Sequence, residues 1–133
     1  MKKRGFTLIE LLIVVIIIGV LVTLAIGNYM RSVERSKAGK AMNNLLSIRN
    51  TQTWYRACND QYCDDVNALG DWGLPLSSIT ADRDWTYTVP VHTAIELEVT
   101  ATRAVGPYTG QSITIDENGK LTTTAPQAPW DVK

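Results

Sequence analysis

The 133-residue chain has few of the residues that carry catalytic or metal-binding chemistry. It contains two cysteines and one histidine, and they form neither the C-x-x-C spacing of a redox site nor a cluster of metal ligands. The sequence has no glycine-rich phosphate loop, no internal repeat, and no nucleophile beside a base at a recognisable spacing. It therefore predicts no enzyme, no metal site and no cofactor.

Charge is almost missing from one long stretch of the chain. Between Leu8 and Ile26 the single charged residue is Glu10, and the remainder is mostly aliphatic. A run of about 19 such residues is long enough to cross the hydrocarbon core of a bilayer. This end of the chain therefore belongs in a lipid-like environment, which excludes a wholly soluble protein. With roughly 105 residues left for one soluble domain, a multi-domain enzyme and a polytopic transporter are also excluded.

The formal net charge of zero hides two segments of opposite sign. From Arg31 to Arg56 there are six basic residues and one acid, Glu34, whereas from Ala57 onward there are four basic residues and eleven acids. The sequence thus predicts a basic stem that carries an acidic head. A nucleic-acid-binding domain would place its basic residues on the folded domain itself, so nucleic acid is expected as a partner only of a larger assembly.

Three basic residues, Lys2, Lys3 and Arg4, precede the apolar run. This arrangement is typical of a signal for membrane insertion or export whose basic end stays in the cytoplasm. One interpretation is a secretory signal peptide cleaved near Ala25-Ile26-Gly27. Against it, the apolar run is longer than the usual 7–15 residues of such a signal, and it contains a carboxylate near its start.

Glu10 is the residue that most needs an explanation. A charged side chain inside a membrane helix costs about 3 kcal/mol and normally has a partner. No basic residue lies between Gly5 and Met30. Cleavage just before Phe6 would supply a positive partner, because it creates an α-amino group about one helical turn from Glu10. That amine could belong to the same chain or to a neighbouring subunit.

The segment Lys2–Gly5 followed by Phe6–Val15 resembles the class III signal of type IV prepilins and their pseudopilin relatives. The resemblance implies that a prepilin peptidase cuts between Gly5 and Phe6 and methylates the amine of Phe6. It also implies that Glu10 neutralises the N-terminus of an adjacent subunit during filament assembly. The expected organisation is a leader at 1–5, a transmembrane and filament-core helix at 6–29, and a soluble head at 30–133.

A single helix is expected from Phe6 to about Ala57. Its second half is amphipathic, and we expect a stripe at three- and four-residue spacing to pack under a sheet. Gly27 stands where many type IV pilins carry proline, so a kink there is less secure, and the segment from Gly19 to Gly27 is the weakest part of the helix. The predicted stripe consists of Met30, Val33, Ala38, Ala41, Leu45, Ile48, Gln52 and Tyr55.

Cys58 and Cys63 follow the helix, separated by four residues. In an exported chain that enters an oxidising compartment, this pair predicts one structural disulfide. A bridge here would stabilise the junction between helix and sheet.

The remaining sequence alternates with a period of two and predicts strands. The expected strands begin at Trp85, Ala94, Ser112 and Lys120, with a hairpin turn at Asp116-Glu117-Asn118-Gly119. Turn chemistry explains these acids without a calcium ion. In the second strand Ile95, Leu97, Val99 and Ala101 share one face, which is expected to cover the helix.

These expectations combine into an α+β fold, with one long N-terminal helix packed against an antiparallel sheet of three to four strands. The predicted function is structural: a type IV pilus subunit that waits in the inner membrane with a periplasmic head and ends in an extracellular filament. Its expected partners are other pilin subunits, the prepilin peptidase and the inner-membrane assembly platform. The filament would serve motility, adhesion or DNA uptake. The alternatives are a type II secretion pseudopilin and a membrane-anchored binding domain that never polymerises.

Overall fold

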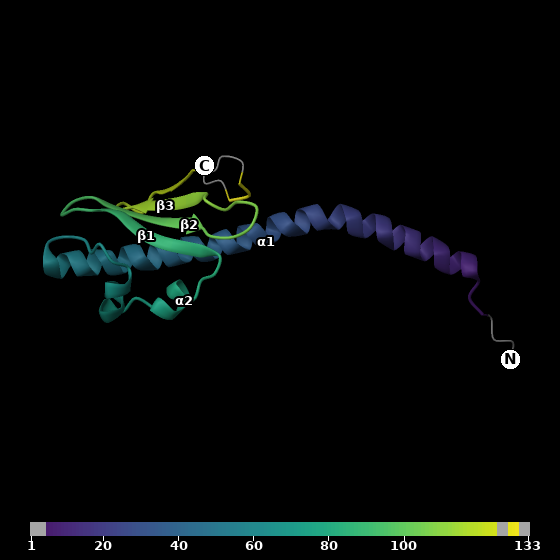
Figure 1. Ribbon diagram of the computed structural model, residues 1–133, viewed down its shortest axis with the longest axis horizontal. Helices are drawn as coiled ribbons and strands as arrows, with labels where there is room; N and C mark the ends of the chain where they lie inside the picture. The colour runs from purple at the N-terminus through teal and green to yellow at the C-terminus, as the bar shows by residue number, and fades with distance from the viewer. Residues whose placement is uncertain (1–4, 125–127, 131–133) are drawn as a thin grey trace.

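The computed structural model describes residues 5–124 and 128–130. One long helix, α1 (Leu8–Asn59), extends from the N-terminal end, and its second half packs against a four-stranded sheet (Figure 1). The predicted α+β fold is therefore confirmed. The helix bounds differ by two residues at each end from those expected.

Helix α1 has defined caps at both ends. Thr7 is the N-cap and forms a capping box with Glu10, and Asp60 ends the helix in the left-handed conformation with φ of 60°. The 52 residues span about 78 Å at 1.5 Å per residue. Helical structure continues through Gly19 and Gly27, and Figure 1 shows a gently curved helix without a break.

The sheet is an antiparallel meander in the order β1-β2-β3-β4. The strands are β1 (Trp85–His92), β2 (Leu97–Arg103), β3 (Ser112–Asp116) and β4 (Leu121–Thr123). Edge strand β1 contains Pro90 and changes register between Thr88 and Val91. Proline has no N–H to give to a ladder, so an irregular position on an edge strand accommodates it.

The core lies between α1 and one face of the sheet. On the sheet side, Trp85, Leu97, Val99, Ala101, Ile113 and Ile115 are almost fully buried. Two short helices connect α1 to β1 and close the core from the side: the 3-10 helix η1 (Asn67–Trp72) and α2 (Leu76–Thr80), which contribute Leu69 and Ile79. On the helix side the buried residues are Glu34, Ala38, Ala41, Asn44, Leu45, Ile48 and Gln52.

Two predicted core positions were wrong. Met30 is 50% exposed, because the buried face of α1 begins one turn later, at Glu34. Ile95 is 70% exposed because it lies in the turn before β2, where the Thr93 side chain accepts hydrogen bonds from the backbone N–H groups of Ile95 and Glu96. The alternation predicted for this strand begins only at Leu97.

Candidate processing and assembly segment

Gly5 and Phe6 lie just before α1, outside regular secondary structure. Both are exposed, and the Phe6 side chain is 82% accessible. Glu10 follows one helical turn later, in the first turn of α1. Gly5, Phe6 and Glu10 thus lie at the N-terminal end of α1, and both residues that flank the Gly5–Phe6 peptide bond are exposed.

The Glu10 carboxylate is bound within its own chain by Thr7. Its Oε2 atom accepts hydrogen bonds from the Thr7 backbone N–H at 2.9 Å and from the Thr7 hydroxyl at 2.7 Å. The Glu10 backbone N–H in turn donates to Thr7 Oγ1 at 3.3 Å. The positive end of the helix dipole also favours a negative charge at this position. These contacts lower the free-energy cost of placing an ionised carboxylate in the apolar segment, but they do not neutralise its charge.

The first half of α1 has no cover within the subunit. An 18-residue window of the helix has a mean hydropathy of 3.1, and none of it is buried. By length and composition this helix could cross a membrane. Leaving leucine, isoleucine and valine side chains in water costs roughly 1.5–3 kcal/mol each relative to burial. This surface therefore requires either lipid or the helices of other subunits.

Cys58 and Cys63 lie at the opposite end of α1 from Glu10, and the structure does not form the expected bridge. Both are free thiols, with Cys58 exposed in the last turn of α1 and Cys63 buried beyond it. The Cys63 Sγ donates to the Asp65 carbonyl at 3.3 Å. The Gln52 side chain holds this junction instead. Its Nε2 donates to the Cys63 carbonyl at 2.7 Å, and its Oε1 accepts from the Cys63 N–H at 2.8 Å.

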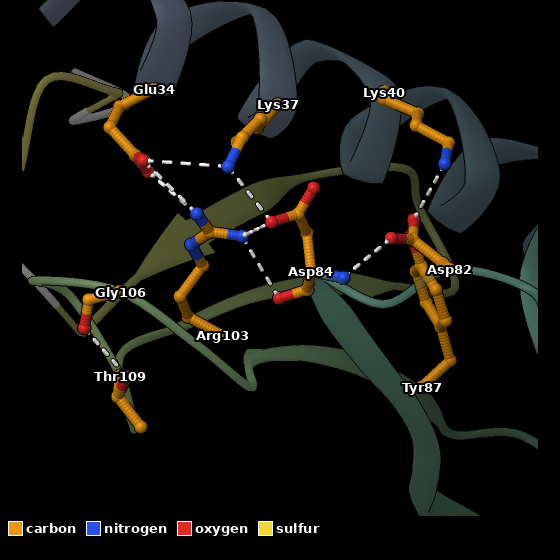
Figure 2. A network of polar contacts seen from close by, with 9 residues as sticks. All are labelled: Glu34, Lys37, Lys40, Asp82, Asp84, Tyr87, Arg103, Gly106 and Thr109. Carbon is orange, nitrogen blue, oxygen red and sulfur yellow. Dashed lines mark hydrogen bonds and ion pairs between the residues drawn. The ribbon is translucent and has the colours of Figure 1, made fainter. Parts of the chain in front are cut away.

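A polar network that sequence analysis missed attaches the head to α1 (Figure 2). The Arg103 side chain is 1% exposed, and its Nη2 lies 3.0 and 3.1 Å from the two carboxylate oxygens of Glu34. Its Nη1 contacts Asp84 Oδ1 at 2.8 Å and donates to the Asp84 carbonyl at 3.0 Å. Lys37 Nζ lies 3.0 Å from Asp84 Oδ1 and 3.9 Å from Glu34 Oε1. Figure 2 shows these groups alternating in charge between helix and sheet.

A second branch of this network surrounds Asp82. Lys40 Nζ lies 3.3 Å from Asp82 Oδ2, and the Tyr87 hydroxyl donates to the same oxygen at 3.1 Å. Asn44 Nδ2 donates to the Tyr87 oxygen at 2.9 Å. Asp82 and Asp84, which lie just before β1, are therefore paired with two lysines about one helical turn apart on α1. These contacts fix the rotation of the helix under the sheet.

The network shifts the pKa of two of its members. Burial alone would raise the pKa of Asp84, but the hydrogen bonds and positive charges of Arg103 and Lys37 outweigh it and hold the pKa below its ordinary value. Burial raises the pKa of Tyr87, Asn44 opposes that rise, and the nearby Asp82 charge adds to it. The tyrosine is therefore a neutral hydrogen-bonding group. Within residues 5–124 and 128–130, no group of three or more potential ligands could hold a metal ion.

Residues 1–26 match the family model described as the prokaryotic N-terminal methylation motif. The type IV major fimbrial protein FimA of Dichelobacter nodosus is 32% identical over 139 aligned positions, which cover 96% of this chain and 85% of that protein. The chain belongs to the type IV pilin family. The match to FimA runs through the head as well as the stem, so membership does not depend on the N-terminal motif alone.

Two further relatives match about half of this chain. The type IV major pilin protein PilA of Myxococcus xanthus is 44% identical over 69 residues, which are 52% of this chain and 31% of PilA. The type II secretion system core protein G of Escherichia coli is 38% identical over 61 residues, which are 46% of this chain and 42% of that protein. In both cases the match spans less than half of the relative. The sequence-based assignment to type IV pilins and pilin-like proteins is confirmed.

Proposed function

We propose that this chain is a structural subunit of a type IV pilus, held in the inner membrane by α1 before assembly and stacked in an extracellular filament afterwards. The observation that carries the proposal is the apolar half of α1, which is not covered by any other part of the described subunit. The match to a fimbrial protein along nearly the whole chain supports it. In the filament the apolar helices of other copies replace lipid as the cover.

The proposed maturation begins with cleavage between Gly5 and Phe6 by a prepilin peptidase, followed by methylation of the Phe6 amine. The leader at 1–5 carries Lys2, Lys3 and Arg4, whose charge favours keeping that end in the cytoplasm during insertion. The 6–29 segment is then the membrane and filament-core helix, and 30–133 is the periplasmic head. An inner-membrane assembly platform would extract the processed subunit.

Glu10 has the central role in the proposed assembly. Thr7 already satisfies one of its oxygens, and the second oxygen, Oε1, remains for the amine of another subunit. An ion pair with that amine is strong only in a site without water, which the apolar helices would provide. Because both charges lie at the same end of each helix, pairing them would set the axial offset between neighbouring subunits.

A pseudopilin of a type II secretion system is the second candidate, because 46% of this chain is similar to core protein G. The pilus is favoured because the FimA match also covers the head. We further propose that the subunit has no catalytic activity of its own. Mass spectrometry of filaments sheared from cells tests the assignment. We expect the chain in the filament, beginning at a methylated Phe6, whereas its absence from sheared filaments or a start at Asn28 would contradict the proposal.

A further inference from the structure

The basic residues of the stem differ in their contacts with the head. Lys37 and Lys40 pair with carboxylates, Arg49 donates to the Glu117 carbonyl, and Arg56 lies over the Tyr62 ring. Arg31 and Arg35 are both exposed, and neither forms an ion pair with any carboxylate in the described part of the chain. Arg35 makes one hydrogen bond, from Nε to the Pro129 carbonyl at 3.0 Å.

These two arginines lie where α1 leaves the apolar run. They are four residues apart and therefore share one face of the helix. Counting from Ile26, they stand about 7.5 and 13.5 Å beyond the end of the run at 1.5 Å per residue. Helical side chains lean toward the helix N-terminus, which here is the direction of the bilayer, and arginine can extend several ångströms that way. Both guanidinium groups can thus reach the phosphate layer, and the 68% exposed Tyr29 lies closer still.

The head contributes an uncharged loop that lies at about the same position along α1 as Arg35. Residues Ala104–Pro107 follow β2 and are all exposed, and Val105 is 50% accessible. Gly106 lies beside the Arg103 guanidinium, and that guanidinium binds Glu34, so this loop is close to α1 one residue before Arg35. Figure 1 shows the connection between β2 and β3 at the end of the head that faces the apolar half of α1.

We propose that Tyr29, Arg31, Arg35 and Val105 form a lipid-docking end of the head, which binds the phosphates of anionic phospholipids while the subunit resides in the membrane. Guanidinium groups bind phosphate with paired hydrogen bonds, tyrosine is favoured at the membrane interface, and Val105 adds an apolar contact. Docking would hold the head at a fixed height and rotation before extraction. The inference rests on the membrane-resident state of the proposed function and does not require a filament.

The test uses the full chain in phosphatidylcholine vesicles that contain either spin-labelled phosphatidylglycerol or spin-labelled phosphatidylcholine. The fraction of motionally restricted label gives the preference of the protein for the anionic lipid. One basic residue near an anionic surface is worth up to about fivefold in association, so we expect a several-fold preference that 0.5 M salt reduces by screening. In the variant Arg31→Gln/Arg35→Gln this preference should fall several-fold, to the level that Lys2, Lys3 and Arg4 provide.

Lys120→Gln is the matched control, because Lys120 is an exposed basic residue on the turn before β4. It should leave the preference unchanged. Lys2, Lys3 and Arg4 also attract anionic lipid, but they are common to every variant, so the difference between variants isolates the two arginines. Glutamine keeps a helix propensity close to that of arginine, and circular dichroism checks that each variant is folded.

A second measurement follows the hydrogen exchange of the loop after β2. Hydrogen exchange of the amides at 104–106 should be several-fold slower in vesicles containing phosphatidylglycerol than in phosphatidylcholine alone, and Val105→Asp should remove that difference. An unchanged lipid preference in Arg31→Gln/Arg35→Gln would overturn the proposal. If that variant also lost filaments, the two arginines would instead contact another copy of the chain. Failure of the wild-type chain to insert into any vesicle would contradict the proposed function itself.

Discussion

Arg103 on β2 and Glu34 on α1, 69 residues apart in the sequence, form an ion pair in which one guanidinium nitrogen contacts both carboxylate oxygens. Both side chains are almost inaccessible to water, at 1% and 6%. A buried pair of this kind contributes little over a well-packed apolar pair, yet it is costly to break because the remaining charge stays buried. The pair therefore acts chiefly in specifying how the head sits on the helix.

Removing one member of this pair should destabilise the head strongly. For Glu34→Gln we expect a loss of about 3 kcal/mol in the free energy of unfolding, because Arg103 loses a charged partner in a buried site. Arg103→Met should cost at least as much, because it also releases Asp84. The measurement is denaturant unfolding of the full chain in detergent micelles, followed by the fluorescence of the buried Trp85.

The double variant Glu34→Gln/Arg103→Met completes this test. It should lose clearly less than the sum of the two single losses, because neither buried charge is then left alone. Glu98→Gln, on the exposed face of β2, is the control and should change stability by less than about 0.5 kcal/mol. Strict additivity of the two single variants would mean that the pair is not coupled.

The lowered pKa of Asp84 predicts a loss of stability in acid. A carboxyl whose pKa is lower in the folded than in the unfolded chain stabilises the fold above its unfolded value, here 3.8, and this contribution disappears as the pH falls through the folded value. The difference in unfolding free energy between wild type and Asp84→Asn should therefore be constant from about pH 5 to 8 and shrink below about pH 4. Urea unfolding across this pH range measures it. A difference that did not shrink as the pH fell below about 4 would remove Asp84 as the titrating group.

The helix and strands could be predicted from sequence because their signals are local. The period-two alternation indicated three strands, the hairpin turn at Asp116–Gly119 indicated the fourth, and the apolar run followed by a stripe indicated α1. Glu34 could also have been identified as buried: with Ala38, Ala41, Leu45, Ile48 and Gln52 it forms an unbroken series at spacings of four and three. Its charge argued against a core position, and its partner Arg103 comes from β2, whose place depends on the tertiary fold.

At the helix-to-sheet junction, in contrast, the contacts that hold the chain could not be predicted from the sequence. Cysteine spacing indicated a covalent bridge, whereas the structure holds the buried Cys63 backbone through the Gln52 amide. A side-chain amide that bonds both the N–H and the carbonyl of one distant residue has no sequence signature. The position of Gln52 on the buried stripe was predicted correctly, but its hydrogen-bonding role depends on the path of the chain after Asp60.

This arrangement predicts unequal effects of two substitutions at the junction. Gln52→Met retains the side-chain volume but leaves the Cys63 N–H and carbonyl unpaired in a buried site, at about 1–3 kcal/mol for each unsatisfied group. Cys58→Ser changes an exposed free thiol and should cost less than about 0.5 kcal/mol. Unfolding of both variants under non-reducing conditions measures the difference. A loss of about 2 kcal/mol or more in Cys58→Ser, abolished by reductant, would instead indicate a bridge.

The last prediction separates two roles that Glu10 could have. In the structure its carboxylate caps α1 through Thr7, and in the proposed assembly it also pairs with the amine of another subunit. Glu10→Leu removes both the cap and the charge. Glu10→Gln removes the charge but retains a side chain that can complete the capping box, since glutamine serves at this position. Comparing the two variants therefore distinguishes a structural cap from a charge required for assembly.

We expect both variants to enter the membrane and to be cleaved after Gly5, because neither adds charge to the apolar run and removing the carboxylate saves about 3 kcal/mol on insertion. Both should nevertheless yield far fewer filaments than wild type, because a methylated amine entering an apolar core would find no negative partner there. Processing is measured by the intact mass of the membrane-bound chain, and assembly by the amount of chain in sheared filaments. If Glu10→Gln assembled at wild-type yield while Glu10→Leu did not, the cap would be sufficient and charge pairing would be abandoned. If both assembled normally, Glu10 would have no assembly role, and the axial offset between subunits would have to come from contacts between heads.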